Sequence, residues 1–181
     1  SAGGMDKDVM KRLLRDAGLP IPRFITLKSD DPVPGFQRVV SKLKSPFFVK
    51  PANMGSSVGI SKVHNKKEYE NALKEAFSYD LKVLIEEFIE GRELECSVLG
   101  NNNPMASVVG EIKSTHDFYS YEAKYKDEKG AVLEIPAKIP DKKAGQIQRL
   151  AVETFRVLSC EGMGRVDFFL RKNPNCSNND C

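Results

Sequence analysis

The chain has 181 residues, of which 40% are hydrophobic and 29% are charged, a composition typical of a globular protein. Its 28 basic and 25 acidic residues leave a net charge of only +3 and form no dense basic tract, which argues against binding to nucleic acid or to a membrane. No apolar run approaches the ~20 residues of a membrane span and no signal peptide is visible at Ser1, so we expect a cytoplasmic protein. Four cysteines and two histidines lack zinc-ligand spacing, and we expect Cys96 and Cys160 to be reduced thiols.

The first predicted element is a helix over residues 5–18. Its apolar face comprises Met5, Val9, Leu13 and Leu14. Asp6 is the predicted N-cap, and Gly18 is the predicted stop.

Helical and strand patterns then alternate along the chain. Further helices are predicted over 29–44, 65–79 and 141–158, the last capped by Asp141. Strands are predicted over 23–27, 47–49, 58–63, 82–88, 92–99, 105–112, 131–136 and 162–170. The polar, asparagine-containing residues 171–181 are expected to lack fixed structure.

The stretch 46–63 is the strongest local signal. A short apolar strand ends at Lys50, and we expect Pro51 to stop its pairing because proline has no N–H group. The loop residues suited to approach or bind a ligand are Gly55, Ser56, Ser57 and Gly59. A lysine and a small polar loop between two strands predict an anion site, although the spacing is not that of a Walker loop. A plain β-hairpin with a surface lysine fits the same residues.

Two other segments carry polar residues in a notable arrangement. Arg165 and Asp167 are two apart in a predicted strand, so they share one face, as a functional pair or as a structural salt bridge. Residues 113–130 are polar and tyrosine-rich and show no periodicity, which predicts a functional loop. We expect residues 114–130 of it to act as a lid.

In this order, these blocks resemble the D-alanine–D-alanine ligases, a family of ATP-grasp enzymes. The resemblance is carried by residues 5–7, 17–20, 48–59, 83–93, 121–125 and 164–168. It implies an α/β (α+β) ATP-grasp domain over 1–170, made of two lobes with antiparallel sheets flanked by helices. The first lobe would cover about 5–87 and the second about 88–170, with a hinge near 87–91. The family's amino-terminal domain and its Glu-x-Asn segment have no counterpart here, so we expect a partial chain.

The resemblance also implies roles for individual residues. Lys7, Lys50 and Lys124 would contact ATP phosphates, and Gly55, Ser56, Ser57 and Val58 would close over them. Glu86 and Glu93 would meet the adenine amino group and the ribose hydroxyls, while Glu87, Phe88 and Ile89 would line the adenine site. Ser56 would bond Tyr125 of the mobile loop, Arg165 would stabilise the reacting centre, and Asp167 would bind Mg²⁺ or Mn²⁺.

The implied reaction joins two D-alanines through an acyl-phosphate, at the expense of ATP, for peptidoglycan synthesis. The implied partners are small molecules, and the resemblance implies a homodimer for the full-length protein, since full-length relatives are commonly dimers. Alternatives are a D-alanine–D-lactate or other ATP-grasp ligase, a nucleotide-binding fragment without turnover, and a pure interaction domain that binds no ATP. We expect the chain alone to bind Mg-ATP weakly and to make no dipeptide.

Overall fold

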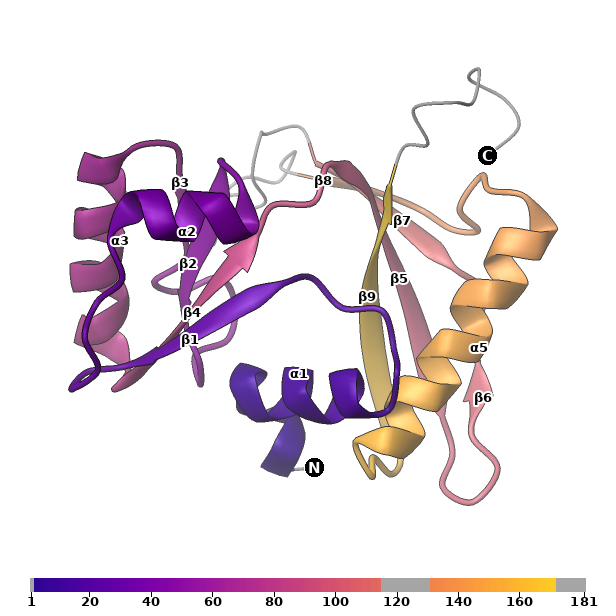
Figure 1. Cartoon of the computed structure of the whole chain (residues 1–181). Coiled ribbons are helices and arrows are strands. Elements are labelled where there is room, and N and C mark those ends of the chain that lie inside the picture. The colour runs from indigo at the N-terminus through magenta and orange to yellow at the C-terminus, as the bar shows by residue number, and fades with distance from the viewer. Residues whose placement is uncertain (1, 115–130, 172–181) are drawn as a thin grey trace. The chain divides into compact units, whose positions relative to one another are not determined.

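The computed structural model of the chain describes residues 2–114 and 131–171 (Figure 1). They divide into an N-terminal unit of residues 2–12 and 20–88 and a C-terminal unit of residues 13–19 and 89 onward. Each unit combines helices with an antiparallel sheet, so the predicted α/β class is confirmed. Among the described residues, no helix has both the length and the apolar character needed to cross a membrane.

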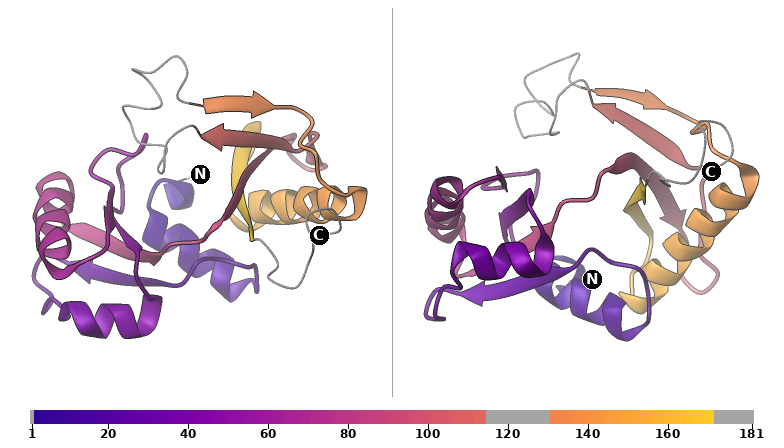
Figure 2. Two further views of the ribbon diagram at one scale, coloured as in Figure 1. Left: turned by 90° about the horizontal axis from the view of Figure 1, so that it is seen from above. Right: turned by 45° about the horizontal axis from the view of Figure 1, so that its top comes forward.

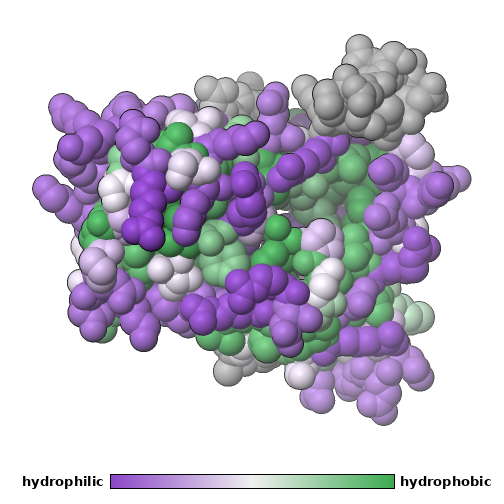
Figure 3. Space-filling model, viewed as in Figure 1, coloured by the Kyte–Doolittle hydropathy of each residue, from purple (hydrophilic) through white to green (hydrophobic). Residues whose placement is uncertain are grey.

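The N-terminal unit is built on a sheet with strand order β1-β4-β2-β3. Its strands are β1 (Phe24–Lys28), β2 (Phe47–Pro51), β3 (Ser61–Val63) and β4 (Lys82–Glu87). The helices α2 (Phe36–Leu43) and α3 (Lys66–Tyr79) pack on one face of this sheet and form a hydrophobic core with it. Hydrophilic side chains cover much of the outer surface over these helices (Figure 3), as expected for amphipathic helices.

The helix α1 (Lys7–Asp16) follows a short 3-10 helix at Ala2–Gly4. The predicted cap is confirmed, because Asp6 Oδ1 accepts hydrogen bonds from the backbone N–H of Asp8 at 2.9 Å and of Val9 at 3.2 Å. The predicted stop is confirmed too. Gly18 has a φ of +75°, and Leu19 N–H reaches back to Leu14 O at 2.9 Å.

Of the predicted apolar face of α1 only Leu14 is buried, and the other three residues are not. Met5, Val9 and Leu13 are 71%, 39% and 42% exposed, whereas Asp8 and Lys11 are only 5% and 6% exposed. The side of α1 that faces the sheet meets charged residues of the strands, so polar side chains rather than apolar ones are buried there.

Three further expectations for the N-terminal unit are corrected. The helix predicted from residue 29 starts at Phe36, because residues 29–31 form a turn in which Asp31 Oδ2 accepts from Lys28 N–H at 2.8 Å. Pro51 does not stop pairing with β4, since it lies opposite Val83. The strand predicted over 58–63 begins only at Ser61, because residues 56–59 form a turn.

The C-terminal unit has a five-stranded antiparallel sheet in which β5 is central. Its elements are β5 (Gly91–Leu99), β6 (Met105–Ala106), β7 (Gly110–Ser114), β8 (Ala131–Glu134), α5 (Asp141–Val157) and β9 (Met163–Arg171). β9 pairs with the whole length of β5, while β6 and β7 share its other edge. α5 packs on one face of the sheet (Figure 2) and encloses a core with Leu94, Cys96 and Val98.

Some predictions for the C-terminal unit also need correction. The strand predicted over 105–112 is split in two at Ser107, whose Oγ accepts from Ser97 N–H at 3.0 Å in place of a carbonyl group. Asp141 is the first residue of α5, and Pro140 is its N-cap. Cys96 and Cys160 are free thiols, as expected. Arg171 belongs to β9, and the remaining residues of the expected unstructured tail lie outside the described ranges.

Candidate functional site

One face of the N-terminal sheet meets α1 instead of the hydrophobic core. Side chains alternate along a strand, so Lys50 of β2 and Glu86 of β4 point to this face while Val49 and Ile85 lie in the core. α1 is fixed against the same face, since Asp8 Oδ1 accepts from Thr26 Oγ1 at 2.7 Å. The result is a polar layer between a helix and a sheet.

Glu86 is the centre of this layer. Its Oε1 lies 2.5 Å from Lys50 Nζ, and its Oε2 forms an ion pair with Lys11 Nζ. The Glu86 carboxylate is buried, with 8% of the side chain exposed. Burial by itself would raise the pKa of Glu86, but the charges of Lys50 and Lys11 outweigh it and hold the pKa below the usual value, so Glu86 is an anion at neutral pH.

Lys7 is bound to the loop that follows β2. Its Nζ donates to Pro51 O at 3.1 Å, to Ala52 O at 3.3 Å and to Met54 O. Burial and the positive charge of Lys50 lower the pKa of Lys7. Lys7 and Lys50 thus place two positive charges where this loop begins, which suits an anion.

The loop over residues 52–60 is held at both ends. Asn53 donates from its backbone N–H at 2.7 Å and from Nδ2 at 2.9 Å to Asp80 Oδ2. At the other end Gly59 has a φ of +67°, and an added Cβ would lie 2.7 Å from the Tyr79 ring. Ser56 and Ser57 also have positive φ values, 51° and 61°. The structure therefore brings Gly55, Ser56, Ser57 and Val58 next to the Lys7-bound carbonyls, on a tightly turned backbone.

The three residues expected to line an adenine site are not alike. Glu87 points to the opposite side of β4, where its carboxylate is bound by Arg23. The backbone N–H of Arg23 donates to Glu87 Oε1 at 2.9 Å, and Arg23 Nε donates to Glu87 Oε2 at 2.7 Å. Phe88 lies near the polar face, with its ring 6.0 Å from that of Phe48 and with Lys62 Nζ 4.2 Å above it. Ile89 belongs to the C-terminal unit.

In the C-terminal unit, the predicted residues lie on the sheet face that α5 leaves uncovered. Asp167 of β9 is paired in register with Glu95 of β5, and Glu93 is two residues from Glu95 on the same face. Arg165 donates from Nε to Asp167 at 2.7 Å and reaches Glu95 at 3.3 Å. An arginine and several carboxylates thus share one open surface, with Arg165 and Asp167 55% and 60% exposed.

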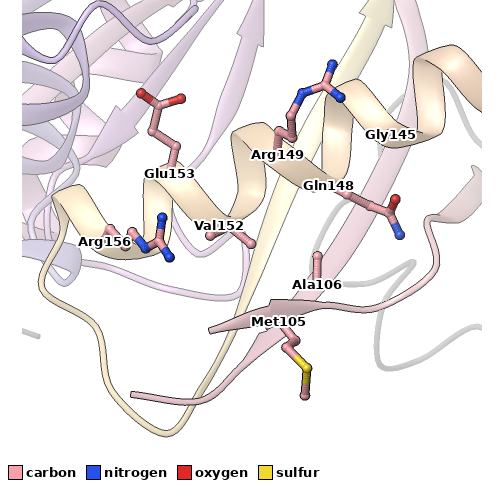
Figure 4. Close-up of a pocket in the computed structure, with 8 residues that line it drawn as sticks. All are labelled: Met105, Ala106, Gly145, Gln148, Arg149, Val152, Glu153 and Arg156. Carbon is pink, nitrogen blue, oxygen red and sulfur yellow. The ribbon is translucent and has the colours of Figure 1, made fainter. Parts of the chain in front are cut away.

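Two expected site residues, Lys124 and Tyr125, lie outside the described residues, as does most of the expected lid. Within residues 2–114 and 131–171 no three metal-binding side chains come together. A hollow of about 890 Å³ in the C-terminal unit holds no predicted site residue (Figure 4). It is lined by Met105, Ala106, Gly145, Gln148, Arg149, Val152, Glu153 and Arg156.

Comparison with known proteins adds to this geometry. Residues 13–180 match the family model described as D-ala D-ala ligase C-terminus. The chain belongs to the D-alanine–D-alanine ligase family. The resemblance seen in the sequence blocks is therefore confirmed.

Individual ligases are similar over nearly the whole chain. A D-alanine–D-alanine ligase of Oceanobacillus iheyensis is 53% identical over 171 residues, which are 94% of this chain and 47% of that protein. D-alanine–D-alanine ligase A of Escherichia coli strain K12 is 54% identical over the same shares. The crystal structure of the VanG D-Ala:D-Ser ligase from Enterococcus faecalis matches with a TM-score of 0.83 and 36% identity, over 94% of this chain and 49% of that one. The chain thus spans about half the length of the ligases it matches.

Sequence reasoning missed several residues that shape the site of this ligase-family chain. Lys11 lies one helical turn after Lys7, so its i+4 spacing was a usable signal. Lys82, which pairs with both Asp6 and Asp8, gave no such signal, because its partners are more than 70 residues away. Glu95 was visible only as an alternate residue of a strand.

Proposed function

We propose that this chain is the nucleotide-binding part of an ATP-dependent ligase that joins two D-alanines for cell-wall precursors in the cytoplasm. The observation that carries the proposal is the Lys50–Glu86 pair beside the 52–60 loop. Lys11 and Lys50 both pair with the Glu86 carboxylate, and Lys7 interacts with the charges of Lys50 and Glu86, so positive charge exceeds negative charge among these four groups. Such an excess suits the phosphates of a nucleotide.

In this proposal Lys7 and Lys50 contact the ATP phosphates, together with the loop residues Gly55, Ser56, Ser57 and Val58. Lys7 can do so by exchanging one of its loop carbonyls for a phosphate oxygen. Glu86 and Glu93 meet the adenine amino group and the ribose hydroxyls, because carboxylates accept from both kinds of donor. Phe88, beside Phe48, offers an aromatic surface to the base. Glu87 is held by Arg23, so only its backbone is available to the nucleotide.

The chemistry requires activation of a carboxylate. Transfer of the ATP γ-phosphoryl group to one D-alanine carboxylate makes an acyl-phosphate, and the amine of a second D-alanine then attacks the carbonyl carbon and releases phosphate. Arg165 stabilises the negative charge on the reacting oxygens, since a guanidinium group binds phosphate and carboxylate oxygens in pairs. Lys124, Ser56 and Tyr125 complete the proposed catalytic set.

A divalent cation, Mg²⁺ or Mn²⁺, would neutralise charge on the phosphates. Asp167 fits as one carboxylate ligand, and its register partner Glu95 lies on the same face. The described residues do not supply a third ligand, so phosphate oxygens and water would complete the coordination, as is usual for Mg²⁺. We also propose that the longer ligase is a homodimer that acts on small molecules.

A chimera tests this function. In it, the present chain replaces the matching 171 residues of E. coli D-alanine–D-alanine ligase A. We expect phosphate release that depends on both ATP and D-alanine, and loss of this release in the same chimera with Arg165→Met. Parallel reactions with D-serine or D-lactate as the second substrate decide the acceptor. A chimera that folds and binds ATP but releases no phosphate with any of these acceptors contradicts the proposal.

A further inference from the structure

We propose that Lys11 is a positioning residue that keeps Glu86 paired when Lys50 turns from Glu86 to a bound phosphate. This inference rests on the proposed nucleotide-binding function. It concerns a residue on α1 that the sequence patterns did not single out. Glu86 holds two lysines at once, one on each carboxylate oxygen, although one lysine would neutralise it.

The two lysines differ in their surroundings. The Lys11 side chain is 8% exposed, and its Nζ lies 5.5 Å from the centre of the Phe24 ring. The Lys50 side chain is 15% exposed and stands at the end of β2, where the 52–60 loop begins. Lys50 is therefore the one that can reach a ligand at the loop, while Lys11 is enclosed between helix and sheet.

α1 is held in place independently of Glu86. Lys82 Nζ pairs with Asp6 and lies 3.4 Å from Asp8, and Asp8 also accepts from Thr26. α1 runs beside β1 (Figure 2), and these contacts hold it against β1 through Thr26 and against β4 through Lys82. Lys11 thus projects from an anchored helix and remains at Glu86 when Lys50 moves.

The physical need for a second lysine follows from burial. A buried carboxylate without a partner is strongly destabilising, so a single lysine would be locked to Glu86. If Lys50 left, it would gain a phosphate and strand a buried charge, and the two effects would oppose each other. With Lys11 in place the carboxylate stays paired and Lys50 exchanges one anion for another.

The inference predicts a specific pattern of nucleotide affinities. Dissociation constants for adenosine, ADP and Mg-ATP are measured by calorimetry on the 181-residue chain and on Lys11→Met. In the variant Glu86 retains Lys50, so the gain in affinity from adenosine to ATP should fall at least about tenfold, while adenosine binding changes little. Lys67→Met, a lysine exposed on α3, is the matched control and should keep the full gain.

Two further variants separate positioning from a merely structural role. Lys11→Arg keeps the positive charge and should keep most of the gain. In Lys11→Met/Glu86→Gln the carboxylate is removed, so Lys50 is released and the gain should return even if adenosine binds more weakly. A uniform loss for adenosine and ATP, or a double variant that recovers nothing, overturns the inference.

One measurement needs no Lys11 variant and decides the question if Lys11→Met fails to fold. In the ¹⁵N-labelled chain, Mg-ATP should shift the Nζ resonance of Lys50 strongly and that of Lys11 weakly. Equal shifts of both lysines, or a shift of Lys11 alone, would refute the positioning role. If the chain binds ATP and shows either of these two contrary patterns, only the inference about Lys11 is refuted. If the chain binds no ATP, the proposed function is refuted and the inference with it.

Discussion

Lys50 and Glu86 lie on neighbouring antiparallel strands and meet at 2.5 Å between Nζ and Oε1. They are not directly opposite each other, since Lys50 pairs with Leu84 and Glu86 with Phe48. The contact is therefore diagonal, which a long lysine side chain can span. It places a cation at the start of the 52–60 loop and gives the polar face its fixed charges.

The first prediction concerns acid stability. The ion pairs hold the pKa of Glu86 below its unfolded value of about 4.5. Their contribution to the free energy of unfolding is therefore complete above pH 4.5 and is lost as the pH falls through the folded pKa. Glu86→Gln should therefore flatten the fall in stability below pH 4.5, as measured by urea unfolding at a series of pH values. Glu70→Gln, on the exposed side of α3, is the control. An unchanged pH profile in Glu86→Gln would be inconsistent with a charged, paired Glu86.

The second prediction concerns the loop backbone. Gly59 has a φ of +67°, and an added Cβ would lie 2.7 Å from the Tyr79 ring and 2.9 Å from Pro51. Gly59→Ala should lower the free energy of unfolding by about 1–3 kcal/mol, from strain and overpacking together. At Gly55 an added Cβ meets nothing within 4 Å, so Gly55→Ala should leave stability unchanged and affect only ligand binding. Equal stability of the two variants would contradict the loop conformation.

The third prediction concerns the anchor of α1. Asp6 caps the helix and pairs with Lys82, so Asp6→Ala should lower the free energy of unfolding by about 1–2 kcal/mol. Asp6→Asn keeps a capping side chain and loses only the charge, so its loss should be smaller. Asp16→Ala, at the carboxyl end of the same helix, should not lower the free energy of unfolding, because it removes a negative charge that is unfavourable there. A loss in Asp16→Ala as large as in Asp6→Ala would refute the capping role.

Local patterns predicted the elements well where the chain itself determines the outcome. Asp6 and Gly18 mark the two ends of α1 as expected, because a cap and a left-handed stop depend only on neighbouring residues. Asn65 likewise caps α3, and its side chain accepts from Glu68 N–H. The order of strands and helices follows from the same local signals.

The predictions were wrong where residues distant in the sequence determine which side chains are buried and which strands pair. The apolar side of α1 is exposed, because the sheet presents Glu86 and Lys82 to the helix and buries Asp8 and Lys11. Pro51 stays paired with β4, and the next residue, Ala52, donates its N–H to Lys82 O of β4. Successive N–H groups of a strand point to opposite edges, so the N–H that Pro51 lacks would point away from β4. On that other side pairing with β3 has ended at Val49.

The candidate site likewise has residues that local sequence patterns identify and residues that only tertiary contacts identify. Lys50 at the end of an apolar strand, and Arg165 two residues from Asp167, were visible in the sequence because strand periodicity places them. Lys11 was missed although its spacing from Lys7 was visible, since that spacing does not tell a buried lysine from an exposed one in an amphipathic helix. Only the tertiary contact with Glu86 gives Lys11 a role.

The most direct test of the central claim is calorimetry of Mg-ATP binding to this chain. We predict weak, magnesium-dependent binding that Lys50→Met weakens at least about tenfold, because one charge-assisted contact contributes about 1.5–3 kcal/mol. Lys67→Met should leave the affinity unchanged. If the unsubstituted chain binds no ATP, or if Lys50→Met binds as tightly as the unsubstituted chain, the polar face around Lys50 and Glu86 is not a nucleotide site.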